Sequence, residues 1–115
     1  MMKQLRSILL LAFVIASCAL AHAILPDAQF RRIAVKDGLS NSQINGIFRD
    51  SRGFMWFATA AGLNRYDGFS MKKFFSRNDN AGSLPDDNVL SVQEDRNGML
   101  WVKTARSYAI YNPRT

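Results

Sequence analysis

Short apolar runs separated by turn residues are the main pattern of the chain after residue 40. The runs hold four to six residues, most of them are rich in apolar, aromatic or β-branched types, and Gly, Asn, Asp or Ser stand between the runs. This pattern is typical of antiparallel strands joined by tight turns. The runs lie at residues 44–48, 55–59, 63–67, 71–75, 89–92 and 100–104. We therefore expect an all-β fold.

One unit of this pattern occurs twice. Residues 50–67 read DSRGFMWFATAAGLNRYD, and residues 95–112 read DRNGMLWVKTARSYAIYN. Aligning 39–67 with 84–112, at an offset of 45 residues, gives seven identities. They are Leu39/Leu84, Asp50/Asp95, Gly53/Gly98, Trp56/Trp101, Thr59/Thr104, Ala60/Ala105 and Tyr66/Tyr111. Repeats of about 40–50 residues occur in propellers and helical arrays, and the short runs favour the propeller.

Each repeat is predicted to form one β-propeller blade, a four-stranded antiparallel meander. Residues 37–81 supply four strands and form the first blade. Residues 82–115 form an incomplete second blade, because the equivalent of Met71–Phe75 would lie beyond Thr115. Complete propellers hold about four to eight blades. We interpret the chain as one full and one incomplete blade from the N-terminal part of a larger ring.

Residues 24–36 form a leading segment before the first blade. Within it, Phe30–Val35 reads FRRIAV and predicts a strand. In a closed propeller, a strand at this position often completes the last blade of the ring. That blade is not part of this chain, so the outer faces and edges of the fragment are expected to be open to association.

Residues 1–23 have the three-part pattern of a secretory signal peptide and are expected to be helical. Lys3 and Arg6 give a positive start, Ile8–Ile15 is apolar, and Ala21-His22-Ala23 is a small-x-small cleavage site. An alternative is lipidation at Cys18, because Ile15-Ala16-Ser17-Cys18 resembles a lipoprotein box. We favour cleavage after Ala23, and either route predicts export.

The remaining chain excludes several kinds of chemistry. Removing the leader lowers the net charge from +6 to +4, and the basic residues are dispersed, so nucleic acid is not an expected partner. Cys18 and His22 are the only Cys and His, and both lie in the leader. Residues 24–115 can therefore form no internal disulfide and have no imidazole base, His-based metal site or phosphoacceptor histidine. We expect no catalytic residues, no metal and no cofactor, and the fragment itself is not a kinase.

The repeated positions are expected to have structural roles. Asp50 and Asp95 should accept N–H bonds in turns that need the positive φ of Gly53 and Gly98. Trp56 and Trp101 are expected to fill the core between blades. Thr59 and Thr104 are expected to form hydrogen bonds with the backbone at strand ends. The other repeat positions are Gly62, Tyr66 and Tyr111. Arg65 and Asp67 are candidates for a local ion pair or a turn contact.

The pattern Asp50-x-x-Gly53-x-x-Trp56-x-x-Thr59-x-x-Gly62-Leu63-x-x-Tyr66-Asp67, preceded by Gly38-Leu39-Ser40, resembles the two-component regulator propeller repeat. The second copy departs from it, with Ser107 for Gly, Ile110 for Arg and Asn112 for Asp. The resemblance implies a periplasmic sensor region of a hybrid histidine kinase, built from seven-bladed propellers and anchored in the inner membrane through the parent protein.

The resemblance also implies partners and a signal. The full propeller would bind an oligosaccharide or another small ligand, and the parent would be a dimer whose kinase modules respond. Ligand contacts are expected from the loops at residues 60–62, 77–83 and 104–107, because residues that bind ligands often lie on loops. Two alternatives remain: part of a propeller enzyme that degrades glycans, and a small secreted protein that self-assembles through its open edges.

Overall fold

The structure is a computed structural model of residues 1–115 that describes all of them except residues 1 and 25–26. The side chains of residues 18–26 also lie outside the described part. The chain divides into two compact units, residues 1–31 and residues 32–115, which we describe separately.

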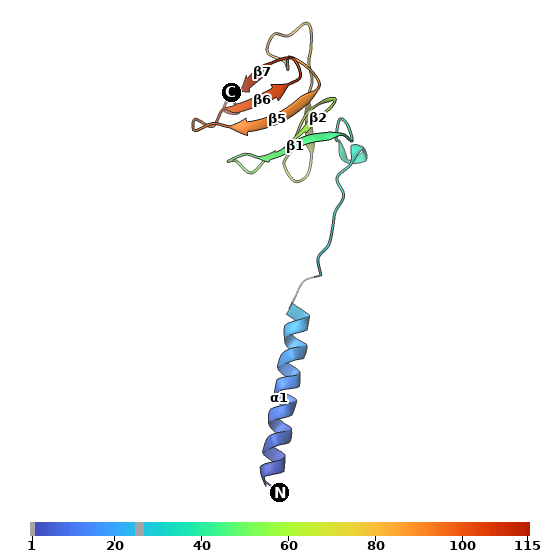
Figure 1. Cartoon of the computed structure of the whole chain (residues 1–115), viewed down its shortest axis with the longest axis vertical. Helices are drawn as coiled ribbons and strands as arrows, with labels where there is room; N and C mark the ends of the chain where they lie inside the picture. The colour runs from blue at the N-terminus through green and yellow to red at the C-terminus, as the bar shows by residue number, and fades with distance from the viewer. Residues whose placement is uncertain (1, 25–26) are drawn as a thin grey trace. The chain divides into compact units, whose positions relative to one another are not determined.

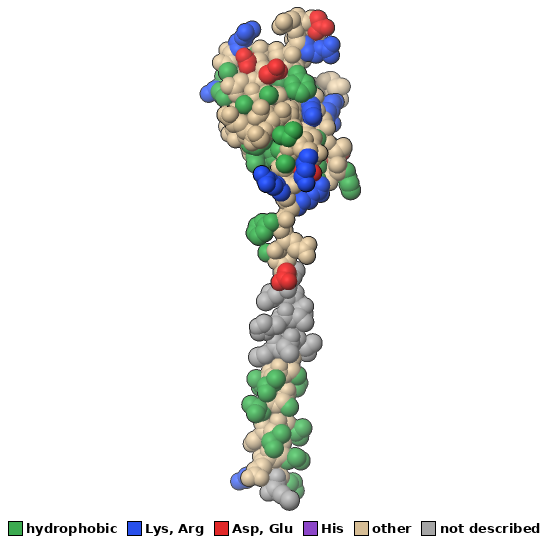
Figure 2. Space-filling view, turned by 90° about the vertical axis from the view of Figure 1, so that its right-hand side faces the viewer, with side chains coloured by type: hydrophobic (Ala, Val, Ile, Leu, Met, Phe, Trp, Pro, Cys, Tyr) green, Lys and Arg blue, Asp and Glu red, His purple; other side chains and the backbone are tan. Residues whose placement is uncertain are grey.

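Helix α1, Met2–Ile24, makes up most of the first unit (Figure 1). Its side chains from residue 2 to residue 17 are exposed, and Figure 2 shows hydrophobic groups along the visible face. Within the described residues, no helix has both the length and the apolar character needed to cross a membrane. The cleavage site at Ala21–Ala23 and the alternative at Cys18 fall among side chains outside the described part.

The leading segment differs from its prediction. Residues 27–34 have no regular secondary structure, and a 3-10 helix, η1, spans Val35–Asp37. The predicted strand at Phe30–Val35 is therefore wrong for this chain. A strand is stabilised by hydrogen bonds to a neighbouring strand, and no strand among the described residues pairs with residues 30–35.

The first sheet contains four antiparallel strands in chain order. They are β1 (Ile44–Arg49), β2 (Met55–Thr59), β3 (Gly62–Tyr66) and β4 (Met71–Phe74). Every strand predicted from residues 44–75 is present, with ends that differ by at most one residue. The apolar runs and their Gly and Asp turns were sufficient to locate them, because consecutive strands in a meander pair locally.

The second sheet repeats the first three strands. It contains β5 (Val89–Glu94), β6 (Leu100–Thr104) and β7 (Tyr108–Tyr111), again antiparallel and in chain order. An irregularity in register falls at the same place in both sheets, between Ile44 and Gly46 and between Val89 and Ser91. The predicted fold class, one four-stranded blade and one incomplete blade after an N-terminal helix, is confirmed.

The hydrophobic core lies between the two sheets. The first sheet contributes Trp56, Ala58 and Leu63, and the second contributes Val89, Val92, Leu100 and Val102. Gly46 of β1 lies against β5, where an added Cβ would lie 3.2 Å from the carbonyl oxygen of Leu90. A side chain at this position would separate the first strands of the two blades, so glycine permits their close packing.

Candidate functional site

The turn between β1 and β2 is held by the carboxylate of Asp50. Its Oδ1 accepts hydrogen bonds from the backbone N–H groups of Arg52 and Phe54, both at 2.9 Å. Its Oδ2 accepts a hydrogen bond of 2.8 Å from the indole Nε1 of Trp56. Gly53 has φ of 90° within this turn. Both oxygens are thus engaged in shaping the hairpin, and Asp50 is buried.

The equivalent turn of the second blade repeats these bonds. Asp95 accepts N–H bonds from Asn97 and Met99 and a bond of 2.9 Å from the indole Nε1 of Trp101. The indole bond and the Met99 bond hold the pKa of Asp95 below its ordinary value of 3.8, because they stabilise the ionised carboxylate. Gly98 takes a φ of 78° in this turn.

The threonines at the ends of β2 and β6 close the next turn of each blade. Thr59 Oγ1 donates to the carbonyl of Gly62 at 2.7 Å and accepts from the N–H of Ala61 at 3.1 Å. Thr104 Oγ1 donates to the carbonyl of Ser107 at 2.7 Å and accepts from the N–H of the same residue at 3.1 Å. The hydroxyls replace backbone partners within a tight turn, which is the role expected for strand-end threonines.

The two tryptophans differ in burial. Trp56 is 1% exposed and packs between the sheets, with its ring centroid 5.7 Å from that of Phe74 and 5.7 Å from that of Tyr111. Trp101 is 42% exposed. The prediction that both fill the core between blades is therefore wrong for Trp101. It lies on the face of the second sheet that points away from the first, and no further sheet covers that face in the described part of the chain.

Tyr66, Arg65 and Asp67 surround the turn between β3 and β4. The hydroxyl of Tyr66 donates to the carbonyl of Gly68 at 2.7 Å. Asp67 accepts backbone bonds from Ser70 and Phe69, and these two bonds hold its pKa below 3.8. The guanidinium of Arg65 lies 4.7 Å from the centre of the Phe54 ring.

The structure distinguishes the two predicted roles of Arg65 and Asp67, a turn contact and a local ion pair. The suggested turn contact of Asp67 is present, whereas an ion pair with Arg65 is not. Across the described residues, only Arg77 and Asp79 lie within ion-pair distance, at 3.4 Å on the surface.

The three loops expected to contact a ligand lie at one end of the sheets. The strands run alternately up and down, so residues 60–62, 77–83 and 104–107 all follow or precede the same ends. The backbone joins the blades here, because the N–H of Gly62 donates to the carbonyl of Asp87 at 2.6 Å. The Asp50 and Asp95 turns lie at the opposite end.

A row of amide side chains crosses from blade to blade at this end. Gln43 Nε2 lies 3.4 Å from Asn45 Oδ1, and Asn45 Nδ2 donates to Asn88 Oδ1 at 3.2 Å and to the carbonyl of Val89 at 2.7 Å. Among the described residues, Gln43 Oε1 and Asn88 Nδ2 have no hydrogen-bond partner. We call Gln43, Asn45 and Asn88 the amide row.

Sequence reasoning missed the amide row, although one signal was present. Gln43 and Asn88 are separated by 45 residues, so they occupy the same position of the repeat. Amides at a recurring position next to the first strand of each blade would have indicated a polar edge shared by neighbouring blades.

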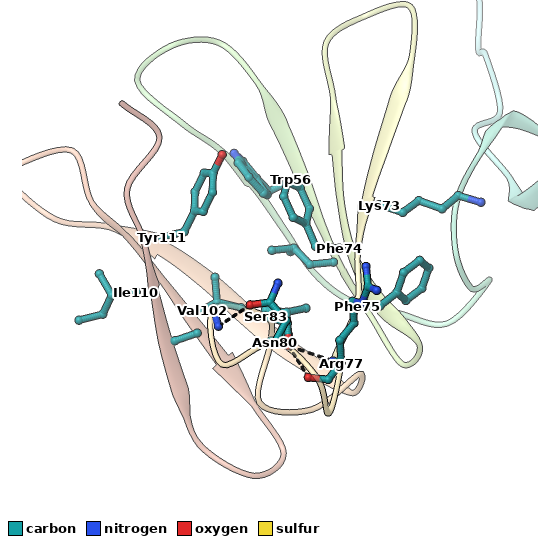
Figure 3. Close-up of a pocket in the computed structure, with 14 residues that line it drawn as sticks. Trp56, Lys73, Phe74, Phe75, Arg77, Asn80, Ser83, Val102, Ile110 and Tyr111 are labelled. Atoms are coloured by element: carbon teal, nitrogen blue, oxygen red, sulfur yellow. Dashed lines mark hydrogen bonds between the residues drawn. The ribbon is translucent and has the colours of Figure 1, made fainter. Parts of the chain in front are cut away.

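A cavity of about 330 Å³ with a mixed lining opens between β4, β7 and the loop at residues 77–84 (Figure 3). The aromatic rings of Trp56, Phe74 and Tyr111 line one part of it. Arg77, Asn80 and Ser83 add polar groups. Of the three expected ligand loops, only residues 77–83 contribute to this cavity.

In the described part of the chain, no group of three or more His, Cys, Asp or Glu side chains is placed to hold a metal ion. Asp50 and Asp95 are each occupied by their own turn, so they do not form a pair of carboxylates around a common point.

Comparison with protein families decides what the repeat is. Residues 38–61 and 83–106 match the family described as two component regulator propeller. The two segments are two-component regulator propeller repeats. They are separated by the same 45 residues as the Asp–Trp turns, and each covers the turn and the strands on both sides of it. No curated protein matches the chain.

A solved structure shows the same arrangement of strands. It is the extracellular domain of the hybrid two-component system BT3049 from B. thetaiotaomicron, which matches with a TM-score of 0.61 and 27% sequence identity. The match covers 73% of this chain and 14% of that structure. The propeller repeats of this chain are thus related to the sensor region of a hybrid two-component system, and they correspond to a small part of that domain.

Proposed function

We propose that this chain is part of the periplasmic sensor region of a hybrid two-component histidine kinase. The observation that supports this most directly is the pair of two-component regulator propeller repeats, together with a solved neighbour from the extracellular part of such a system. In this proposal residues 1–23 direct export, with cleavage after Ala23 or lipidation at Cys18. The parent protein is anchored in the inner membrane and dimeric.

The proposed ligand is a neutral oligosaccharide, and the amide row contributes to its binding. An amide both donates and accepts hydrogen bonds, which suits a sugar hydroxyl. The atoms of the amide row that have no partner among the described residues, Gln43 Oε1 and Asn88 Nδ2, offer one acceptor and one donor. Each blade of a ring would add its own polar edge, so a complete propeller would bind more of the ligand than this chain does.

The proposed mechanism is regulation by binding, without catalysis by the chain itself. A ligand changes the activity of a kinase only if it binds two conformations of the sensor with different affinity. Two blades provide part of the binding surface, and the kinase modules would belong to the parent protein. The carboxylates of Asp50 and Asp95 serve their turns, which supports a role in holding the blades.

Sequencing the gene beyond the codon for Thr115 tests whether the chain belongs to a sensor kinase. We expect an open frame, or one restored by a single frameshift, that encodes further DxxGxxWxxT repeats, a membrane span and a histidine kinase. A stop codon with no such repeats downstream would contradict the sensor proposal and favour a small self-assembling protein instead.

A glycan array tests the ligand. The fluorescently labelled chain is expected to bind a subset of the immobilised neutral oligosaccharides. Asn88→Ala should reduce the bound fluorescence severalfold. Gln93→Ala is the matched control, because Gln93 is an exposed amide near the opposite end of β5. Equal retention by both variants, or no retention by the unmodified chain, would contradict oligosaccharide binding by the amide row.

A further inference from the structure

Residues 40–43 lead into β1 and have no regular secondary structure. Two contacts hold this segment on the first sheet. The backbone N–H of Ser40 donates to Asn64 Oδ1, in β3, at 2.9 Å. The carbonyl of Gln43 accepts a bond of 3.1 Å from the N–H of Ala60, directly after β2. Gln43 is the first member of the amide row, so these contacts determine where that row begins.

Asn64 is completely buried, although it does not point into the core between the sheets. Its neighbour Leu63 packs in that core, and side chains alternate along a strand, so Asn64 lies on the opposite face. A buried amide without partners would be costly. Here Asn64 Nδ2 donates to Ser40 Oγ at 3.0 Å, and Asn64 Oδ1 accepts the Ser40 N–H. Both ends of the buried amide are therefore bonded to one residue.

The hydroxyl of Thr59 adds a second anchor for Ser40. Thr59 has one hydroxyl proton and donates it to the carbonyl of Gly62 at 2.7 Å. Toward Ser40 Oγ, 3.1 Å away, Thr59 Oγ1 can therefore only accept. The Ser40 hydroxyl is accordingly the donor, to Thr59 Oγ1 and, at 3.2 Å, to Asn64 Oδ1. Ser40 is thus held by side chains of both β2 and β3.

The second blade docks the equivalent segment without such a pair. At the repeat offset of 45 residues, Ser40 and Asn64 are replaced by Pro85 and Ala109. Proline fixes its own φ and has no backbone N–H that would need a partner. The docking bond itself is preserved, because the carbonyl of Asn88 accepts from the N–H of Ala105 at 2.9 Å. The second blade is therefore an internal reference for the first.

We propose that Asn64 is a positioning residue, which holds Gln43 in the amide row by anchoring Ser40. Without Asn64, the N–H and the hydroxyl oxygen of Ser40 lose a partner, and the entropy cost of ordering residues 40–43 is less fully offset. The side chain of Gln43 would then leave its position 3.4 Å from Asn45 Oδ1. The consequence for a ligand rests on the proposed function, whereas the positioning of Gln43 does not.

Hydrogen exchange of two equivalent amides, measured by NMR on the full chain, tests the positioning. The N–H of Ala60 reports docking in the first blade, and the N–H of Ala105 reports docking in the second. Asn64→Ala should lower the protection of Ala60 relative to Ala105 by about fivefold, as expected for a lost hydrogen bond. An equal change at both amides would indicate general destabilisation and overturn the proposal, as would unchanged protection of Ala60.

Ser40→Ala is a milder variant that leaves Asn64 in place. It removes the hydroxyl but keeps the bond from the backbone N–H, so the protection of Ala60 should fall by a smaller factor. Ser42→Ala is the matched control, because Ser42 lies in the same segment and is exposed. A loss in Ser42→Ala as large as in Ser40→Ala would overturn the proposal.

Glycan binding tests the consequence for the amide row. Asn64 is buried and cannot touch a ligand, yet Asn64→Ala should reduce the bound fluorescence severalfold, as Asn88→Ala should. Full binding by Asn64→Ala, with the protection of Ala60 lost, would overturn the link between Gln43 and the ligand. If the unmodified chain binds no glycan, the proposed function fails, and the exchange experiment still decides whether Asn64 positions Gln43.

Discussion

The indole Nε1 of Trp56 donates a hydrogen bond of 2.8 Å to Oδ2 of Asp50, six residues earlier in the chain. This bond ties the carboxylate that shapes the hairpin to the side chain that fills the space between the blades. Turn and core are therefore coupled in the first blade. The same bond, at 2.9 Å, joins the exposed Trp101 to Asp95 in the second blade.

Trp56→Phe should destabilise the chain more than Trp101→Phe. Phenylalanine keeps most of the apolar contact but removes the indole donor, which leaves the buried Asp50 carboxylate with one partner fewer. The expected loss is about 1–3 kcal/mol in the free energy of unfolding. At the exposed Trp101, water can replace the donor and the loss should stay below about 1 kcal/mol. Urea unfolding measures both, and losses of equal size would contradict this account.

Gly46→Ala should weaken the packing of the two sheets. The new Cβ would lie 3.2 Å from the carbonyl oxygen of Leu90, and backbone on both sides restricts any adjustment. We expect a loss of about 1–3 kcal/mol, as for other cases of overpacking, measured by thermal or urea unfolding. Gly82→Ala is the control, since its Cβ would meet only the side-chain oxygen of Asn80, also at 3.2 Å, which can move. A harmless Gly46→Ala would show that the sheets can separate without cost.

Stability should fall in acid because of Asp67 and Asp95. Hydrogen bonds hold the pKa of each carboxyl below its ordinary value of 3.8, so the folded state binds protons less readily than the unfolded state. The resulting contribution is present above pH 3.8 and is lost as the pH falls through the lower folded values. Unfolding followed below pH 5 should show this decline, and Asp67→Asn should make it shallower. An unchanged slope in that variant would exclude Asp67 as a source.

Ser51→Ala should loosen the contact between blades at the end that carries the Asp turns. The backbone N–H and the hydroxyl of Ser51 donate to the two carboxylate oxygens of Glu94, at 2.8 and 2.5 Å. Both side chains are near the surface, so the loss should be about 0.5–1 kcal/mol. A double-mutant cycle with Glu94→Gln measures the coupling, and strictly additive losses would show that the two residues do not interact.

The repeat and the strands could be predicted from the sequence because both depend on local interactions. Strand positions follow from apolar runs such as Met55–Thr59 and from glycines such as Gly53 and Gly98, which turn the chain. The roles of Asp50 and Thr59 were also predictable, since their partners lie within six residues. A repeat of 45 residues then indicated blades that stack on each other.

Other features depended on what lies next to each element in space. Trp56 and Trp101 occupy the same position of the repeat, yet only Trp56 has a sheet packed over it. Phe30–Val35 has the residue pattern of a strand but forms no strand, because a strand requires a neighbouring strand to pair with. The amide row and the cavity combine side chains from both blades, for example Asn45 with Asn88 and Trp56 with Tyr111.

The sequence alone therefore determined the strands and turns of each repeat, and the tertiary structure determined which faces of each repeat are covered. Strand and turn formation are governed by neighbouring residues and by the conformational freedom of glycine, which the sequence states directly. Burial and hydrogen bonding between blades depend on residues that lie far apart in the chain, and identical local patterns can have different neighbours. Trp56 and Trp101 show that difference most clearly.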